Sequence, residues 1–123
     1  MVVRHSGGVD TTRDLVQRHL DSFNAGDADG LLADFAPDAT WVTGDYAVPA
    51  GELRSFFEGA MRSIRPRLSL VRTIADGEAV AVEMTETWTH DDVTRRASLI
   101  AVFDLAAGRI KKAKIYREGS ADA

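Results

Sequence analysis

Two titratable side chains interrupt apolar patterns in this sequence and are the first candidates for chemistry. His19 lies on an apolar helical stripe. Glu86 lies in a strand-like segment, where it shares one set of alternate positions with Val82, Met84 and Trp88. A histidine gains or loses a proton near neutral pH, and burial raises the pKa of a carboxyl group. The two side chains therefore predict general acid–base chemistry, for which a hydrogen-bonded core histidine and an exposed glutamate are the structural alternatives.

Four further polar residues could complete such a site. Arg117 can either clamp an anionic ligand or form an ion pair with Glu86. Thr43 ends a segment rich in β-forming residues, and its hydroxyl group can orient a ligand. Asp45 and Tyr46 follow it in a loop, and an aspartate next to a glycine is typical of a turn. We therefore interpret Asp45 and Tyr46 as turn residues in preference to site residues.

The composition excludes several other kinds of chemistry. The chain has 123 residues, no cysteine, and 19 acidic against 15 basic residues, which gives a net charge of −4. This length suits one domain, and the lack of cysteine excludes disulfides, thiolate metal sites and cysteine nucleophiles. The acidic balance disfavours non-specific nucleic-acid binding. His5, His19 and His90 show no metal-ligand spacing, so we expect neither a metal nor another cofactor.

The ends of the chain carry few structural signals. Residues 1–10 contain a Gly-Gly pair and no periodicity, so they predict a flexible leader, followed by a domain over residues 11–118 and a tail over residues 119–123. The first residues lack the apolar stretch of a signal peptide, which favours a cytoplasmic protein. No apolar run approaches the roughly 18 residues of a membrane span, so we expect no membrane partner.

Three helices are predicted in the first half of the chain. The first begins at Thr11 and ends at Gly26, and a short second helix ends before Pro37. The third covers residues 52–64, and a short strand over residues 38–43 precedes it. The apolar face of the second helix is Leu31, Leu32 and Phe35, and that of the third is Leu53, Phe56, Phe57, Ala60, Met61 and Ile64.

The second half of the chain changes from helical to strand periodicity. Turn signals separate four strand-like runs at about residues 67–75, 79–89, 94–105 and 109–117. Short turns between consecutive strands predict an antiparallel meander. Helices followed by a meander indicate an α+β domain in which the helices cover one face of a curved sheet.

The first half also carries a family resemblance. The segments Leu15–Leu20, Phe23–Asp27 and Gly30–Thr40 together resemble the NTF2-like superfamily, in its SnoaL-like and ketosteroid-isomerase-like branch. The resemblance implies a cone-shaped fold, with three helices on a curved, mostly antiparallel sheet that encloses a deep apolar pocket. Relatives include isomerases, polyketide cyclases, dehydratases, epoxide hydrolases and non-catalytic binding proteins, so the activity depends on the pocket residues.

The catalytic residues of steroid isomerases in this superfamily are not retained. Those enzymes use an aspartate base, with a tyrosine and a protonated aspartic acid that stabilise the oxyanion. The resemblance places the tyrosine position on His19, the base on Thr43 and the acid on Ala101. Threonine is not a useful base near neutral pH and alanine has no proton to donate, so steroid isomerisation by that mechanism is not expected.

The pocket face follows from the resemblance and from strand alternation. It is largely apolar, with His19 and Glu86 as the predicted catalytic residues, and Val80, Val82, Leu99, Ala113 and Ile115 share its strand parity. The predicted ligand-binding residues are Phe23, Trp41, Thr43, Phe57, Met61, Met84, Trp88, Ala101, Phe103 and Arg117.

The opposite sheet face predicts a second copy of the chain as a partner. It mixes apolar and charged residues in a pattern that suits a self-complementary interface, and relatives often dimerise through this face. We therefore expect a homodimer. The residues assigned to this face are Thr85, Thr87, Ile100, Val102, Ile110 and Tyr116, with Glu83, Asp104, Lys112 and Lys114.

The resemblance and the apolar pocket face together imply a SnoaL-like domain that binds a small, largely hydrophobic molecule of polycyclic or terpenoid type. As an enzyme it would catalyse isomerisation, cyclisation or dehydration without a cofactor, with His19 and Glu86 transferring protons. The alternative from another class is a non-catalytic binding or assembly module. Epoxide hydrolysis is a weaker alternative, because relatives use an Asp-Arg-Asp set and only Glu86 with Arg117 resembles part of it.

Overall fold

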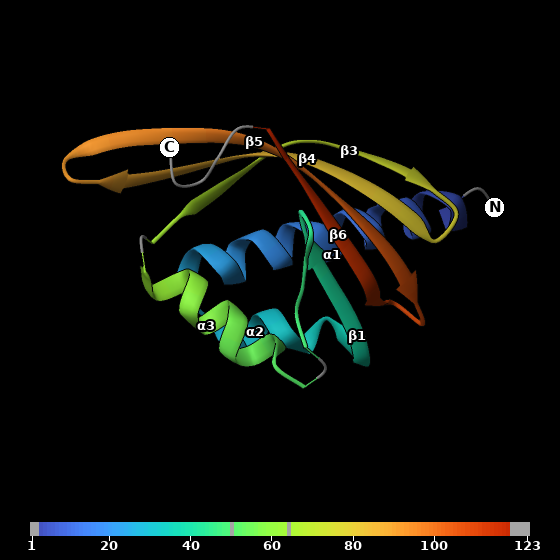
Figure 1. Cartoon of the computed structure of the whole chain (residues 1–123). Helices are drawn as coiled ribbons and strands as arrows, with labels where there is room; N and C mark the ends of the chain where they lie inside the picture. The colour runs from blue at the N-terminus through green and yellow to red at the C-terminus, as the bar shows by residue number, and fades with distance from the viewer. Residues whose placement is uncertain (1–2, 50, 64, 119–123) are drawn as a thin grey trace.

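The computed structural model of the chain describes residues 3–49, 51–63 and 65–118. In this part of the chain, a curved sheet arches over the helices, and α1 runs along its concave side (Figure 1). This arrangement confirms the predicted α+β class. The elements in chain order are α1 (Val3–Ala25), α2 (Ala28–Ala33), β1 (Phe35–Thr43), β2 (Tyr46–Ala47), α3 (Leu53–Ser63), β3 (Arg67–Asp76), β4 (Ala79–His90), β5 (Val93–Ala106) and β6 (Arg109–Glu118).

The six strands form one mixed sheet in the order β2-β1-β6-β5-β4-β3. Strands β3 to β6 pair antiparallel with their sequence neighbours, which confirms the predicted meander. Strand β1 is added in parallel beside β6, with Trp41 opposite Ala113 and Thr43 opposite Ile115. This pairing brings the end of β1 next to the end of β6, so both strands contribute side chains to the same part of the concave face.

A register shift between β5 and β6 changes which residues face inward. Asp104 pairs with Lys112 but Leu105 pairs with Ile110, so one residue of β6 is inserted between them. Because strand side chains alternate between faces, an inserted residue moves the preceding positions to the opposite face. Ile110 is therefore fully buried in the core. The prediction that Ile110 lies on the outer face is wrong.

The helices differ from the predicted ranges at their ends. Helix α1 begins at Val3, within the segment predicted as a leader, because extending an existing helix is easier than nucleating one. Helix α2 ends at Ala33, and Phe35 begins β1, so its assignment to the second helix was wrong. The pairing of β1 with β6 is irregular between Phe35 and Thr40, around Pro37, which lacks an N–H group. Residues 1–2, Ile64 and the tail over residues 119–123 lie outside the described residues.

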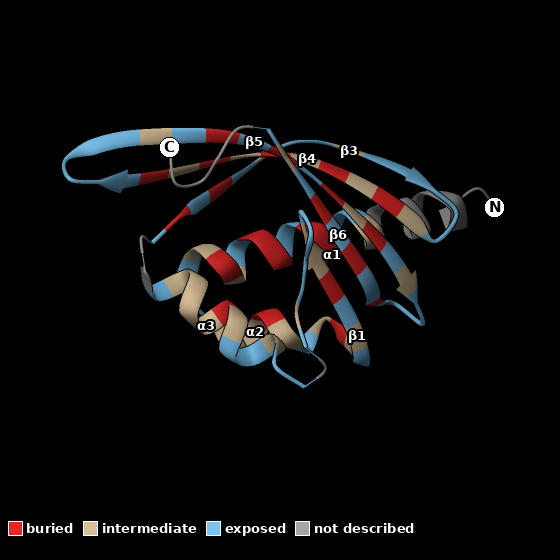
Figure 2. Ribbon diagram, in the orientation of Figure 1, coloured by how far each residue is buried: buried red, intermediate tan, exposed pale blue. Residues whose placement is uncertain are grey.

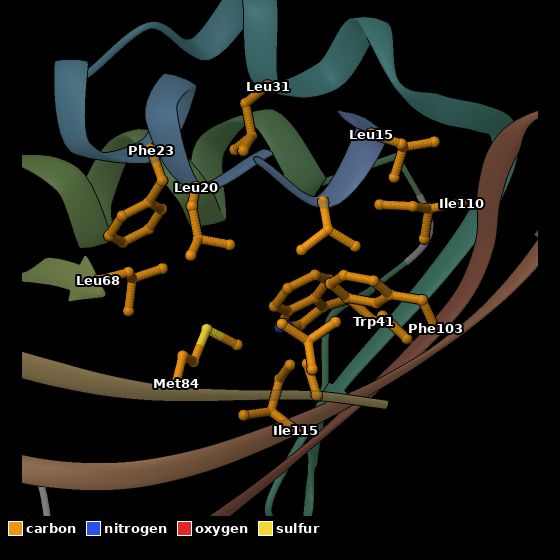
Figure 3. Packing of buried hydrophobic residues seen from close by; sticks show 14 of the residues in the cluster. Leu15, Leu20, Phe23, Leu31, Trp41, Leu68, Met84, Phe103, Ile110 and Ile115 are labelled. Atoms are coloured by element: carbon orange, nitrogen blue, oxygen red, sulfur yellow. The ribbon is translucent and has the colours of Figure 1, made fainter. Parts of the chain in front are cut away.

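The core lies between the helices and the concave face of the sheet. Buried residues alternate with less buried ones along the strands and recur along α1 (Figure 2). In Figure 3, Leu20 and Phe23 of α1 lie opposite Leu68 and Met84 of the sheet. Desolvation of these apolar surfaces is the main force that holds the two layers together.

An asparagine joins the end of α1 to the start of β3. The Asn24 side-chain amide donates a hydrogen bond to the Leu68 carbonyl oxygen (2.8 Å), and the Leu68 N–H donates to Asn24 Oδ1 (2.7 Å). The amide therefore satisfies both backbone groups of Leu68, as a neighbouring strand would. This contact fixes the distance between Phe23, which precedes Asn24, and the first residues of β3.

Candidate functional site

A cavity of about 140 Å³ lies between the concave face of the sheet and helices α1 and α3. Its wall is mainly aromatic and aliphatic, and its polar side chains come from α1, β1, β4 and β6. The lining residues are His19, Phe23, Trp41, Thr43, Phe56, Phe57, Ala60, Leu68, Met84, Glu86, Leu99, Ile115 and Arg117.

The cavity is smaller than the predicted deep pocket. Sites for drug-sized ligands usually have roughly 300–1,000 Å³, whereas an apolar cavity of about 150 Å³ holds a single benzene ring. A volume of about 140 Å³ therefore fits one compact ring. The predicted polycyclic or terpenoid ligand is too large for the cavity as it stands.

His19 is the most deeply buried polar group of the site. Its side chain comes from α1 and is surrounded by Phe35, Trp41, Phe57 and Phe103, with ring centroids 5.3–6.5 Å from its own. This burial lowers the pKa of His19 to about 4, although the nearby charge of Asp34 acts in the opposite direction. The imidazole is therefore neutral at pH 7. Its Nδ1 atom is buried and has no hydrogen-bond partner among the described residues.

Glu86 and Arg117 form an ion pair within the sheet wall. Arg117 Nη2 donates a hydrogen bond to Glu86 Oε1, and the two side chains are 23% and 12% exposed. They come from β6 and β4, on either side of β5, where Ala97 lies opposite Glu86 and Leu99 opposite Arg117. The small Ala97 side chain leaves space for the two long side chains to meet above β5. This contact is the pairing that the sequence offered as one alternative for Arg117.

Arg117 also carries a free hydrogen-bond donor. Its Nε–H is buried and has no partner within the described part of the chain. A buried donor without an acceptor costs on the order of 1–3 kcal/mol, so an acceptor atom brought into the cavity would recover that free energy. Thr43 lies nearby, because it pairs with Ile115, two residues before Arg117 on β6. The polar part of the wall therefore offers a carboxylate, a guanidinium donor and a hydroxyl group.

The structure brings most of the predicted site residues to one cavity. His19 and Glu86 line it, as do six of the predicted ligand-binding residues: Phe23, Trp41, Thr43, Phe57, Met84 and Arg117. The family resemblance, together with the alternation of the strands and the apolar stripes of the helices, places these side chains on a common face.

Four predicted ligand-binding residues lie elsewhere. Ala101 and Phe103 are fully buried in the core, where Phe103 packs against His19. Trp88 is also buried, but it borders a separate surface pocket near the β4–β5 turn. Met61 faces a groove between the ends of α1 and α3. Strand parity correctly turns Ala101, Phe103 and Trp88 inward, but it does not show where packed side chains close the cavity.

The remaining lining residues could be found only in part from the sequence. Leu99 and Ile115 share the pocket parity, and Phe56 and Ala60 belong to the apolar stripe of α3. Leu68 is the residue that sequence reasoning missed, because β3 has few buried positions to define its inner face. Asp45 and Tyr46 lie outside the cavity. Asp45 is exposed, and the Tyr46 ring stacks on Phe56 with centroids 6.2 Å apart.

The described residues form neither a cluster of metal-ligating side chains nor a helix suited to spanning a membrane. They contain no group of three or more His, Asp or Glu side chains placed to bind a metal ion. None of the helices in the described ranges is long and apolar enough to span a membrane.

The sequence matches a known family over most of its length. The model of the SnoaL-like domain aligns with residues 16–113. The match begins at Val16 in α1 and ends at Ala113, in the middle of β6. The chain belongs to the SnoaL-like domain family. This confirms the resemblance found in its first half. Comparison of the SnoaL-like chain with curated protein sequences gives no significant match.

Solved structures share the fold of this SnoaL-like domain. AclR, a putative hydroxylase from Streptomyces galilaeus, is 17% identical with a TM-score of 0.76, covering 86% of this chain and 87% of its own. A putative SnoaL-like polyketide cyclase from Jannaschia sp. CCS1 is 17% identical with a TM-score of 0.76, covering 89% and 86%. TerC, co-crystallised with polyporic acid, is 15% identical with a TM-score of 0.78, covering 88% and 92%. At these identities the likeness shows a common fold.

The buried imidazole predicts a specific loss of stability in acid. Because the pKa of His19 is about 4 in the folded state and near 6.5 when unfolded, the unfolded state binds the proton first as the pH falls. We expect His19 to reduce the free energy of unfolding by about 3 kcal/mol between pH 6.5 and pH 4. Urea denaturation at pH 7 and pH 4 measures this difference.

The His19→Leu variant should lack this part of the pH dependence, since leucine does not titrate. His90→Gln is the matched control, because it also removes one imidazole and the His90 side chain is 62% exposed. The acid-induced loss assigned to His19 should persist in this variant. An equal acid-induced loss in the wild type and His19→Leu would show that His19 is not held neutral by burial.

Proposed function

We propose that this SnoaL-like domain binds a compact apolar molecule that carries a hydrogen-bond acceptor and acts on it by proton transfer. The observation that carries the proposal is the Glu86–Arg117 ion pair in a mainly apolar wall, with Arg117 Nε–H left unpaired among the described residues. The ring of the ligand fills the cavity, and its carbonyl oxygen accepts a hydrogen bond from Arg117. Thr43, at the neighbouring strand end, orients the same polar group.

The ion pair supplies both halves of an enolisation. The Glu86 carboxylate removes a proton from the carbon next to the carbonyl group, and the C–H electron pair becomes the double bond of an enolate. The negative charge moves to the carbonyl oxygen, where the Arg117 Nε–H stabilises it. The carboxyl group then returns its proton to carbon. Return to the same carbon restores the ketone, and return to another carbon completes an isomerisation.

His19 has a different role from the one its position first indicates. With a pKa of about 4 it is neutral at pH 7, so it has no extra proton to give as an imidazolium acid. A neutral imidazole still donates one hydrogen bond and accepts another. We assign His19 to hold a second polar atom of the ligand, with proton relay as a secondary role.

The family supports ligand binding or cyclase chemistry at this site. Similar structures include a putative SnoaL-like polyketide cyclase and a putative hydroxylase, and TerC was co-crystallised with polyporic acid. A cavity with one carboxylate suits base chemistry better than epoxide hydrolysis. That reaction needs a second acid in the relatives, and Glu86 is the one carboxylate among the residues that line the cavity.

Ligand binding without catalysis is the second candidate. It is favoured by Thr43 and Ala101, on which the family resemblance places the steroid isomerase base and oxyanion acid, and by the burial of Ala101 in the core. In this case Glu86 serves only to hold Arg117 in place. The two candidates differ in whether bound ligand exchanges protons.

Hydrogen exchange into a small ketone distinguishes these candidates. We expect the protein to bind phenylacetone and to accelerate the uptake of deuterium from D₂O at the carbon between its ring and carbonyl group. Glu86→Gln keeps the shape and a hydrogen-bond acceptor for Arg117, so it should retain binding and lose exchange. NMR spectroscopy of the ketone measures the exchange, and titration calorimetry measures binding.

Glu83→Gln is the matched control, because Glu83 lies on the same strand and its pairing with Arg72 is far more exposed. This variant should exchange protons at the wild-type rate. Binding without exchange in the wild type would leave a binding module, and no binding of the ketone by the wild type would contradict the proposal.

We also propose that the chain forms a homodimer through the outer face of the sheet. Ile100 and Tyr116 are direct neighbours on β5 and β6 and are 42% and 52% exposed. Charged groups surround them, with Glu83 opposite Ile100 and the Lys114 ammonium 5.3 Å from the centre of the Tyr116 ring. An apolar centre with a mixed-charge border suits a symmetric contact between copies.

Light scattering tests the dimer through the measured mass. We expect twice the 13.4 kDa mass of the chain for the wild type at micromolar concentration. Ile100→Glu should give the mass of one chain, because it places a charge at the centre of the contact. Val93→Glu is the control, since Val93 is 50% exposed but lies at the β4–β5 turn. A monomeric wild type would refute the dimer.

A further inference from the structure

A surface groove lies directly beside the cavity. It has a volume of about 730 Å³ and runs between the end of α1, the end of α3 and the start of β3. Phe23 lines both spaces and is buried, so the cavity and the groove adjoin at this residue. Asn24, which follows Phe23 and lines the groove, holds the end of α1 against β3 through its two hydrogen bonds to Leu68.

The groove carries positive charge that the described residues do not neutralise. Arg62, Arg65 and Arg67 line it, and no carboxylate of the described chain lies within 4 Å of their guanidinium groups. Glu58 is the acidic residue of the groove, and it already pairs with Arg54 at 3.5 Å. The groove is therefore locally cationic, although the whole chain has a net charge of −4.

Helix α3 connects the two spaces through adjacent side chains. Phe57 and Ala60 line the cavity, whereas Met61 and Arg62 line the groove. Residues three and four apart lie next to each other on a helix surface, so Phe57 is adjacent to both Ala60 and Met61. The surface of α3 therefore passes from the aromatic Phe57 to the aliphatic Met61. Arg62 lines the same groove, with Glu58 as its neighbour one turn earlier on the helix.

We propose that the groove is a subsite for a carboxylate at the far end of the ligand whose ring occupies the cavity. This inference rests on the proposed ligand site and adds the class of ligand: an anionic amphiphile with a compact ring. Arginine binds carboxylates in a planar, two-point geometry, which suits a chain that emerges beside Phe23. The three arginines are exposed, so salt screens their attraction for a carboxylate. They therefore contribute more to the selectivity between charged and neutral ligands than to the total affinity.

A matched ligand series tests the subsite. The probes are ω-phenyl carboxylates with two, four and six carbons in the acid chain, each compared with the alcohol of the same length. The alcohols report occupancy of the cavity alone. We expect the carboxylate to bind about tenfold more tightly than its alcohol once the chain is long enough to pass Phe23, with little difference for the shortest pair. Raising the salt concentration should reduce this preference.

Two variants locate the effect. Arg62→Gln combined with Arg65→Gln should remove most of the preference for the carboxylate and leave the affinity for the alcohols unchanged. Arg96→Gln is the control, because Arg96 is exposed on β5 at a position that alternates with the inward-facing Ala97. It removes one positive charge from the outer face of the sheet, where the double variant removes two from the groove, and it should preserve the preference.

The outcomes separate this inference from the function on which it rests. If the alcohols bind but the long carboxylates bind no better, the cavity site stands and the groove subsite is refuted. The preference for carboxylates could also persist in the double variant or disappear equally in Arg96→Gln. In either case it does not come from the arginines of the groove in particular, and the subsite is also refuted. If neither alcohols nor carboxylates bind to the wild type, both the ligand site and its extension are refuted.

Discussion

The packing of α1 against the concave face of the sheet determines every property of the site. One helix cannot fill the hollow of a curved sheet, so α1 and α3 cover it and leave a cavity of about 140 Å³ between the layers. The same packing removes water from His19 and lowers the pKa of its imidazole. It also leaves Glu86 and Arg117 in an apolar wall, where an ion pair has few competing partners. The cavity and its electrostatics are therefore consequences of one interface.

Within that interface, the ion pair is the polar feature with the largest consequences. Burial of two charges is unfavourable unless they meet with good geometry, and removal of one partner leaves a charge that costs on the order of 3–5 kcal/mol. The Glu86–Arg117 contact avoids that cost but uses only part of the guanidinium group, because Nε–H remains unpaired. A protein that needed only stability would be served as well by apolar residues of the same size. The proposed ligand-binding role of the pair rests on this unpaired donor.

Most of the fold could be predicted from the sequence, because the positions of helices and strands follow from the periodicity of apolar residues. Helical stripes and strand alternation are local, so the order of elements and the meander could be predicted from them. The inward direction of His19, Glu86 and Arg117 could be predicted once the family resemblance indicated which strand face lines the pocket. The inward direction of Ile110 could not be predicted. One inserted residue in β6 reverses the alternation, and the composition of the segment does not indicate this insertion. The size of the cavity was also beyond prediction. It depends on how Phe103, Ala101 and Trp88 pack in three dimensions, and these residues close space that strand parity alone leaves open.

The Arg117 Nε–H group offers the most direct test of the central claim, that the cavity binds a compact ring and presents a donor to its polar atom. The measurement is the ¹⁵N–¹H NMR resonance of this group, assigned from its loss in Arg117→Lys and followed as phenylacetone is added. We expect the Arg117 resonance to shift and saturate with the ligand, while the Arg96 resonance stays in place. An Arg117 resonance that does not move, or that moves no more than that of Arg96, would contradict the account.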